Sequence, residues 1–236
     1  MAYRMTTAAD QSDLAGGFVL RSAPGHPGFP VRLAEELFLR AAAHLPDRPL
    51  TLWDPCCGSG HLATVLGLLH RPRLARVICS DANPDAVALA GRNLALLTAA
   101  GLAEREAELR SRAAEFGKPG YATAADAAHR MAVRMAADLP STAFVADAFD
   151  PEPWPADLVL TDVPYGEQTA WLGAAPADPI AALARALCRV LPGHAVVVFC
   201  ARARKVDVGA PALERVRLGT RAAFLGRVAD LRTEWE

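Results

Sequence analysis

The feature that most constrains the fold is an apolar segment that runs directly into a glycine-rich turn. Leu50–Trp53 ends at Asp54, glycines follow at Gly58 and Gly60, and apolar residues then recur at helical spacing. This order of strand, glycine turn and helix is typical of nucleotide-binding folds. Glycine lets the backbone approach a ligand closely, and the start of the helix offers free N–H groups. The third glycine of the G-x-G-x-x-G motif is absent, because Ala63 stands there, which disfavours a dinucleotide.

Aspartate also ends the other apolar segments that we interpret as strands. These strands and their final aspartates are Ala75–Ser80 with Asp81, Thr142–Ala146 with Asp147, and Asp157–Thr161 with Asp162. Helical segments alternate with them, which predicts a mostly parallel sheet with helices on both faces. The aspartates would then lie at the carboxyl ends of the strands, where such sheets bind ligands, and Asp81 is placed to bind ribose hydroxyls. Each could also be an ordinary turn or helix-leading residue.

The rest of the chain completes a single α/β domain over residues 1–236. Residues 1–48 form a proline- and glycine-rich lead-in, residues 1–30, followed by a helix. Pro30 is placed in the first turn of that helix. Residues 101–140 form a helical insertion, with helices over Glu104–Phe116 and Thr123–Ala137. The C-terminal part contains a helix, a buried strand and a hairpin, at Ile180–Leu191, His194–Cys200, and Val216–Leu218 with Ala222–Val228. The insertion either covers the sheet edge or binds substrate.

Composition narrows the class of protein. Hydrophobic residues make up 52% of the 236 positions, which is enough for a large core. The five cysteines, two of them adjacent at Cys56 and Cys57, include no C-x-x-C pair, so we expect no metal site and a reducing, cytoplasmic location. The first residues contain no apolar core of signal-peptide length and no run of 18 apolar residues occurs, so we expect neither a signal peptide nor a membrane-spanning segment. A net charge of −1 gives no sign of nucleic-acid binding, although a local basic face can exist within a neutral total.

The second informative stretch is Asp162-Val163-Pro164-Tyr165. Asp162 and the Val163 carbonyl can accept hydrogen bonds from a planar amine, and Pro164 fixes the backbone so that these acceptors converge. Tyr165 can stack on a base. Holding a weakly nucleophilic nitrogen about 3–3.5 Å from an electrophile removes much of the entropic barrier to its reaction. The alternative is a proline turn beside a core tyrosine.

Both stretches resemble motifs of class I methyltransferases that use S-adenosylmethionine (SAM). The stretch D-P-x-C-G-S-G resembles motif I, and D-V-P-Y resembles the [D/N]-P-P-Y motif IV, with valine in place of the first proline. The resemblance extends to the AviRa family of 23S ribosomal RNA guanine methyltransferases, which are associated with resistance to orthosomycins such as avilamycin. Its segments are Ser22–Ala34, Leu50–Gly60, Val65–His70, Phe116–Pro119, Val159–Glu167 and the C-terminal region Arg215–Arg221, which reads R-V-R-L-G-T-R.

The resemblance implies a Rossmann-like class I methyltransferase with a seven-stranded sheet that methylates a guanine of 23S rRNA or of the large ribosomal subunit. It also implies the site residues. SAM would be bound by Asp54, Pro55, Cys56, Gly58, Ser59, Gly60, Asp81, Ala82, Asp147 and Ala148, and the base would be held by Asp162, Pro164 and Tyr165. We expect a monomer with no DNA or membrane partner. One alternative is a methyltransferase that acts on a protein amide or a small amine. Another is a non-catalytic nucleotide-binding module.

Basic residues near the C-terminus are the candidate RNA contacts. The cluster consists of Arg202, Arg204, Lys205, Arg217 and Arg221. Arginine and lysine bind phosphate groups of RNA, but a cluster of this kind is more often a solvated face. Arg21 and Arg32 flank the lead-in and could add phosphate contacts.

Overall fold

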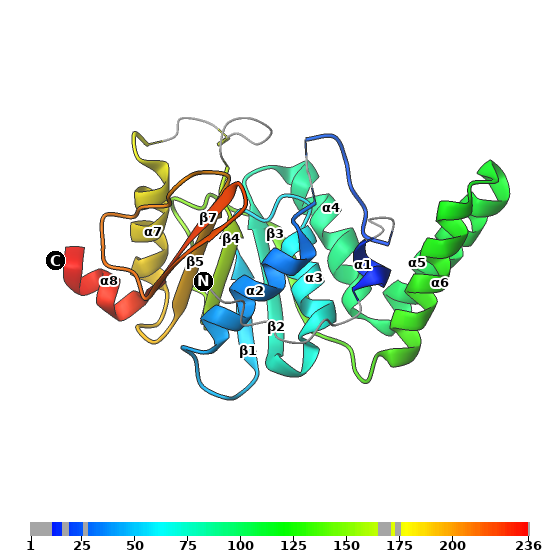
Figure 1. The fold of residues 1–236 in the computed structure, drawn as a ribbon, viewed down its shortest axis with the longest axis horizontal. Helices are drawn as coiled ribbons and strands as arrows, with labels where there is room; N and C mark the ends of the chain where they lie inside the picture. The colour runs from blue at the N-terminus through cyan, green and yellow to red at the C-terminus, as the bar shows by residue number, and fades with distance from the viewer. Residues whose placement is uncertain (1–10, 16–18, 26–27, 165–170, 173–175, 236) are drawn as a thin grey trace.

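In a computed structural model, the chain folds around one seven-stranded sheet (Figure 1). The structure describes residues 11–15, 19–25, 28–164, 171–172 and 176–235. The strands are β1 (Leu50–Asp54), β2 (Leu74–Asp81), β3 (Ser141–Val145), β4 (Leu158–Asp162), β5 (Val196–Ala201), β6 (Glu214–Leu218) and β7 (Arg221–Arg227). Their order across the sheet is β3-β2-β1-β4-β5-β7-β6. The first five strands are parallel, and β7 runs antiparallel to both β5 and β6.

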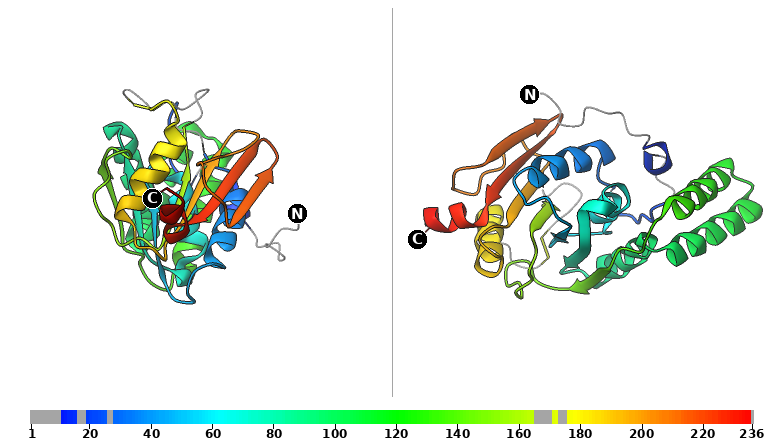
Figure 2. Two further views of the ribbon diagram at one scale, coloured as in Figure 1. Left: turned by 90° about the vertical axis from the view of Figure 1, so that its left-hand side faces the viewer. Right: turned by 90° about the horizontal axis from the view of Figure 1, so that it is seen from below.

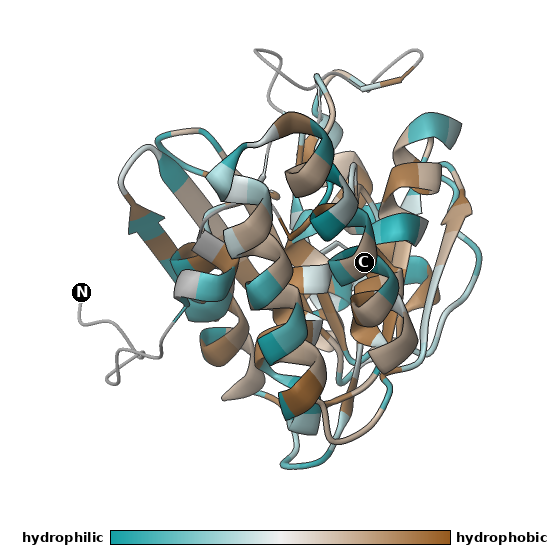
Figure 3. Ribbon diagram, turned by 90° about the vertical axis from the view of Figure 1, so that its right-hand side faces the viewer, coloured by the Kyte–Doolittle hydropathy of each residue, from teal (hydrophilic) through white to brown (hydrophobic). Residues whose placement is uncertain are grey.

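Helices cover both faces of this sheet. They are α1 (Ser12–Ala15), α2 (Val31–Ala42), α3 (His61–Leu69), α4 (Pro84–Leu94), α5 (Ala99–Phe116), α6 (Pro119–Arg134), α7 (Pro179–Val190) and α8 (Val228–Trp235), with short 3₁₀ turns at Arg71–Arg73 and Ala95–Leu97. The hairpin of α5 and α6 projects at the opposite end of the molecule from α7 and α8 (Figures 1 and 2). Figure 3 faces the hairpin end, where helices carry both hydrophilic and hydrophobic residues.

Alternating strand residues supply two separate cores, because successive side chains of a strand point to opposite faces. Leu52 and Leu160 belong to the core shared with α2, α3 and α4. Trp53 and Val159 belong to the core shared with α7 and α8. The central strands are buried on both sides, which is why they appear in the sequence as continuous apolar runs.

The structure confirms the mostly parallel seven-stranded sheet with helices on both faces and the helical insertion. Helix α4 begins after Asn83, whose side chain accepts a hydrogen bond from the Asp85 N–H at 2.9 Å. Pro30, in contrast, precedes α2 as its cap. The insertion helix α5 begins five residues before the predicted Glu104, at Ala99, because the Thr98 hydroxyl caps the Gly101 N–H at 3.0 Å. Helix α8 was not predicted, and it is held by the burial of Val228 and Leu231.

Among the described residues, no single helix is long and apolar enough to cross a membrane. One bent pair, Pro84–Leu97 with Ala99–Phe116, reaches that length and apolarity only when the two helices are taken together across a 109° bend.

Asp157 precedes β4 and links it to its two neighbours, β1 and β5, at the end of the strands opposite the aspartate tips. Its carboxylate accepts hydrogen bonds from the Thr51 N–H at 2.9 Å and from the Arg48 guanidinium at 2.6 Å, and it lies 3.0 Å from His194 Nε2. Its carbonyl accepts from the Val196 N–H at 3.0 Å. Burial raises the pKa of Asp157, but Arg48, Thr51 and His194 outweigh burial and leave that pKa below its ordinary value.

We predict that Asp157→Asn lowers the free energy of unfolding by about 1–3 kcal/mol at pH 7. A carboxyl whose pKa is depressed in the folded state stabilises the protein above its unfolded pKa of about 3.9, and this contribution is lost as the pH falls. The difference in the free energy of unfolding between variant and wild type should therefore have its full size at pH 7 and become smaller below about pH 4. Urea denaturation across this pH range measures it, and a gap independent of pH would contradict the role of the charge.

Candidate functional site

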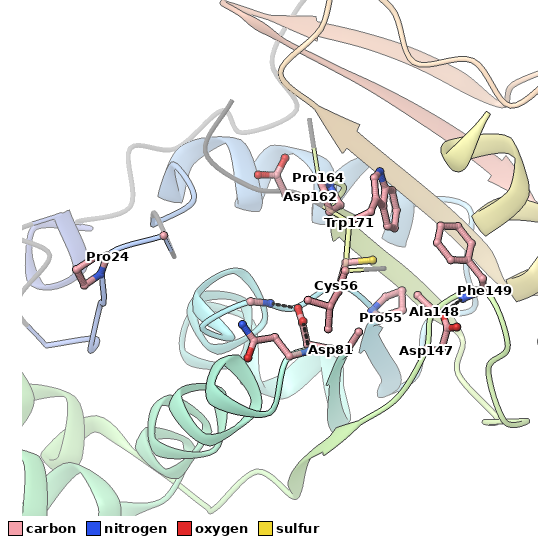
Figure 4. Close-up of a pocket in the computed structure, with 15 residues that line it drawn as sticks. Pro24, Pro55, Cys56, Asp81, Asp147, Ala148, Phe149, Asp162, Pro164 and Trp171 are labelled. Carbon is pink, nitrogen blue, oxygen red and sulfur yellow. Dashed lines mark hydrogen bonds between the residues drawn. The ribbon is translucent and has the colours of Figure 1, made fainter. Parts of the chain in front are cut away.

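The carboxyl ends of four strands surround a cavity of about 380 Å³ (Figure 4). The sequence-predicted residues that line it are Pro55, Cys56, Gly58, Asp81, Ala82, Asp147, Ala148, Asp162 and Pro164. Asp54, Ser59 and Gly60 lie behind this lining and are buried. Tyr165 falls outside the described residues. Segments far apart in the chain therefore meet at one edge of the sheet, as the strand-tip pattern predicted.

The loop after β1 turns through two glycines with left-handed backbone conformations. The φ angle is +51° at Gly58 and +69° at Gly60, where a side chain would be strained. A Cβ atom on Gly60 would also lie 2.9 Å from the Cβ of Ala90 in α4. The Gly60 N–H donates to the Cys57 carbonyl at 2.8 Å, which closes the turn. The loop can adopt this path only because glycine occupies both positions.

Asp81 at the end of β2 connects this loop to α4. One of its oxygens accepts a hydrogen bond from the Gly58 N–H at 2.8 Å, and the other accepts from the Asn83 N–H at 2.9 Å (Figure 4). Each carboxylate oxygen has a second lone pair, so Asp81 can still accept from a ligand hydroxyl. It therefore shapes the cavity as well as bordering it.

Asp54 lies beneath the loop and is almost fully buried. Its carboxylate accepts a hydrogen bond from the Cys56 N–H at 3.3 Å. Burial, together with the charges of Asp81 and Asp162, raises the pKa of Asp54 to about 7. Burial also raises the pKa of the Cys56 thiol well above its usual range, so this cysteine is no thiolate nucleophile at neutral pH. The cavity floor thus holds several carboxyl groups in a confined space, which favours a positively charged ligand.

Aromatic residues that the motifs did not indicate form the wall beyond Asp147. The Asp147 side chain accepts a hydrogen bond from the Phe149 N–H at 2.8 Å and holds the turn after β3. The Phe149 ring lies against Trp171 with ring centroids 4.9 Å apart. Pro24 and Gly25 of the lead-in border the same cavity. For Phe149 the sequence signal was an apolar residue just after a strand-tip aspartate, and for Pro24 and Gly25 it was a proline–glycine pair that predicted a loop.

Asp162 at the end of β4 is paired with Arg221 from β7. The Arg221 guanidinium also lies over the Phe29 ring, 4.9 Å from its centroid. Burial raises the pKa of Asp162 to about 6, and the charge of Arg221 limits this rise. The Phe29 N–H in turn donates to His61 Nδ1 at 3.3 Å, which fixes the lead-in beside α3. A partly buried carboxyl group thus borders the cavity, and an arginine from β7 is paired with it.

The candidate RNA-contacting residues divide into two groups. Arg202, Arg204, Lys205 and Arg217 are exposed, in agreement with a surface role. Only 12% of the Arg221 side chain is exposed, and its guanidinium faces Asp162, so it belongs to the cavity region and not to the exposed basic surface. The antiparallel pairing of β7 with β5 causes this difference, because it brings Arg221 next to the end of β4.

The cavity fits the methyl donor that the motifs imply. Its volume is within the range of small-molecule sites, and the glycine loop provides a backbone cradle that side chains would fill. Carboxylates at the strand tips can accept hydrogen bonds from an amine and from ribose hydroxyls. SAM has both kinds of group and carries positive charge.

Comparisons with known proteins agree with one another. The family model described as rRNA methyltransferase AviRa matches residues 1–221. A curated 23S rRNA (guanine(2535)-N(1))-methyltransferase of Streptomyces viridochromogenes is 54% identical over 234 residues, covering 94% of each chain. Two solved structures of the rRNA methyltransferase aviRa from that organism are similar throughout. One has a TM-score of 0.92, is 51% identical and covers 100% of both chains. The other has a TM-score of 0.90, is 52% identical and covers 98% of both chains. The sheet and helices are therefore a class I methyltransferase fold.

We predict that Gly60→Ala lowers the free energy of unfolding by about 2–4 kcal/mol, because it adds backbone strain and an overpacked contact with Ala90. Gly91 in the same helix α4 is the matched control, since a Cβ atom there meets nothing within 4 Å. Gly91→Ala should instead raise this free energy by about 0.5–1 kcal/mol. Chemical denaturation of both variants measures the difference, and equal effects would show that the loop does not need glycine.

Proposed function

The chain belongs to the AviRa family of rRNA methyltransferases, and we propose that it transfers a methyl group from SAM to N1 of a guanine in 23S rRNA. The enzyme class follows from the family. The substrate is proposed from the name of the curated relative, a 23S rRNA (guanine(2535)-N(1))-methyltransferase, and from the high identity over 94% of both chains.

The observation that carries the proposal is the position of Asp162 and Pro164 on the same cavity as the glycine loop. The loop and Asp81 would hold SAM, with Asp54 beneath it, and Asp147 and Ala148 would lie beside the adenine. Asp162 and Pro164 border the space left for a base. SAM supplies an electrophilic methyl group when it is bound.

The role of Asp162 follows from the chemistry of guanine. Guanine N1 carries a proton and becomes nucleophilic as that proton is lost. The Asp162 carboxylate would accept the proton and later release it to water. Formation of the N1–methyl bond would be balanced by loss of the sulfur–methyl bond, with the sulfur leaving as a neutral thioether. With its pKa at about 6, Asp162 is mostly ionised at neutral pH and still basic enough to accept this proton. A target base within folded RNA would have to leave its stack to reach the cavity.

The biological setting belongs to the same proposal. Methylation of the ribosomal base would reduce binding of orthosomycin antibiotics such as avilamycin and so confer resistance. The exposed residues Arg202, Arg204, Lys205 and Arg217 would contact the RNA. We also propose that the protein acts in the cytoplasm, where ribosomal RNA lies, and that it acts as a monomer.

We predict that labelled methyl is transferred from SAM to a single guanine of unmodified 23S rRNA, which primer extension would locate. Asp162→Ala should abolish transfer and leave SAM binding intact, whereas Asp81→Ala should weaken SAM binding. No transfer to RNA, with SAM still bound, would direct the search to protein amides or small amines. Retained turnover in the Asp162 variant would remove its assigned role.

We further predict that Arg221→Met moves the acidic limb of the pH profile of kcat/KM to higher pH. Arg221 favours the ionised form of Asp162, so its removal raises the pKa of Asp162 further, and activity should fall more at pH 7 than at pH 9. Arg221→Lys keeps the charge and should restore a profile close to that of wild type. A uniform loss at every pH would instead assign Arg221 a purely structural role.

A further inference from the structure

A second hollow lies next to the methyl-transfer cavity, between the lead-in, α4 and the helical hairpin. We call it the arginine groove, and its volume is about 270 Å³. Ser22 and Ala23 line the groove, and the next two residues, Pro24 and Gly25, line the cavity. The two sites are therefore continuous along one stretch of backbone, and the lead-in forms the border between them.

Positive charge dominates this groove. Among the described residues, its charged lining consists of Arg21, Arg92, Arg105 and Arg112, with Glu108 as the only acidic one. A single Glu108 oxygen accepts from Arg21 at 2.8 Å and from Arg105 at 2.7 Å, and the other oxygen accepts from Arg112 at 3.1 Å. One carboxylate thus faces three guanidinium groups, so the groove keeps an excess of positive charge.

Arg105 is the most buried of these four arginines. It is only 5% exposed, and burial, opposed by Glu108, lowers its pKa, with Arg21 and Arg112 adding repulsion. Its guanidinium is held by Glu108 and by the Val19 carbonyl at 2.9 Å. Like charges gathered in a concave site repel one another unless an anion joins them. The buried arginine forms a fixed base for such an anion.

The outer part of the groove is open to a ligand. Arg92 is exposed, and its side chain makes no hydrogen bond or ion pair within the described part of the chain. The Arg112 side chain is 48% exposed and holds Glu108 at one point only. Both side chains can therefore turn toward a phosphate, to which arginine can donate two parallel hydrogen bonds.

We propose that the arginine groove binds backbone phosphates of the RNA next to the target guanine, with Arg92 and Arg112 making the contacts. The proposal rests on the proposed function. RNA is the occupant that this geometry favours, because a strand whose base enters the cavity must continue past its border, and the charged groove lies directly beyond that border. The insertion of α5 and α6 then acts as one wall of an RNA channel, since Arg105, Glu108 and Arg112 all belong to α5.

The test is the salt dependence of binding to a protein-free 23S rRNA fragment that wild type methylates. The double variant Arg92→Ala/Arg112→Ala should bind about tenfold more weakly at physiological salt, and the slope of log K against log salt should become shallower by about 1–2. Glu108→Gln removes the negative charge of the groove and should bind more tightly, with a steeper slope. SAM affinity should be the same in all of these proteins.

Arg110→Ala/Arg134→Ala is the matched control, because both arginines are exposed on the same hairpin and neither lines the groove. Its RNA affinity should remain close to that of wild type. Equal slopes for the groove variant, the control and wild type would overturn the proposal, as would an unchanged slope in Glu108→Gln. Weaker binding to assembled subunits but not to protein-free RNA would assign the groove to a ribosomal protein and overturn it too. Failure of wild type to bind or methylate RNA would instead disprove the proposed function.

Discussion

The close contact between the glycine loop and α4 is the constraint on which the site depends. Gly60 has a positive φ and no side chain, so Ala90 can lie directly against it. Asp81 then reaches the loop N–H at Gly58 from the end of β2. Asn93, fully buried in α4, donates to the Ser59 carbonyl at 2.8 Å from below. A larger residue at Gly60 or at Ala90 would push the loop away from α4 and separate the strand tips that form the cavity.

The lead-in completes the site that the sheet begins. The Arg21 N–H donates to the Asn93 side chain at 2.7 Å, and that side chain donates to the Arg21 carbonyl at 2.9 Å. Further along, Phe29 stacks under the Arg221 guanidinium. One N-terminal segment therefore contacts α4, the arginine groove and the partner of Asp162. These contacts hold the described residues 19–25 and 28–30, which lack regular secondary structure, against the rest of the domain.

Electrostatics in the site depend on burial and on where the cations lie. Asp54 is buried and Asp162 is partly buried, burial raises the pKa of both carboxyl groups, and Asp162 has Arg221 at its side. Arg221 keeps Asp162 available as an acceptor, and the negative charges around Asp54 and Asp81 suit a cationic ligand. The arginines beyond the lead-in show the opposite arrangement, with one carboxylate among several cations. A negatively charged cavity and a positively charged groove thus lie next to each other, with the lead-in between them.

The sequence by itself determined the sheet class and the strand-tip residues, because the apolar runs, the glycines and the aspartates at their ends are local patterns. It could not place Arg221, since that position depends on two pairings, Asp162 with Cys200 and Cys200 with Ala223, that join strands far apart in the chain. The groove around Glu108 was hidden for the same reason, because it forms only when the lead-in packs on α5. Local patterns decide which element forms, whereas the meeting of charges from distant elements is decided by packing alone.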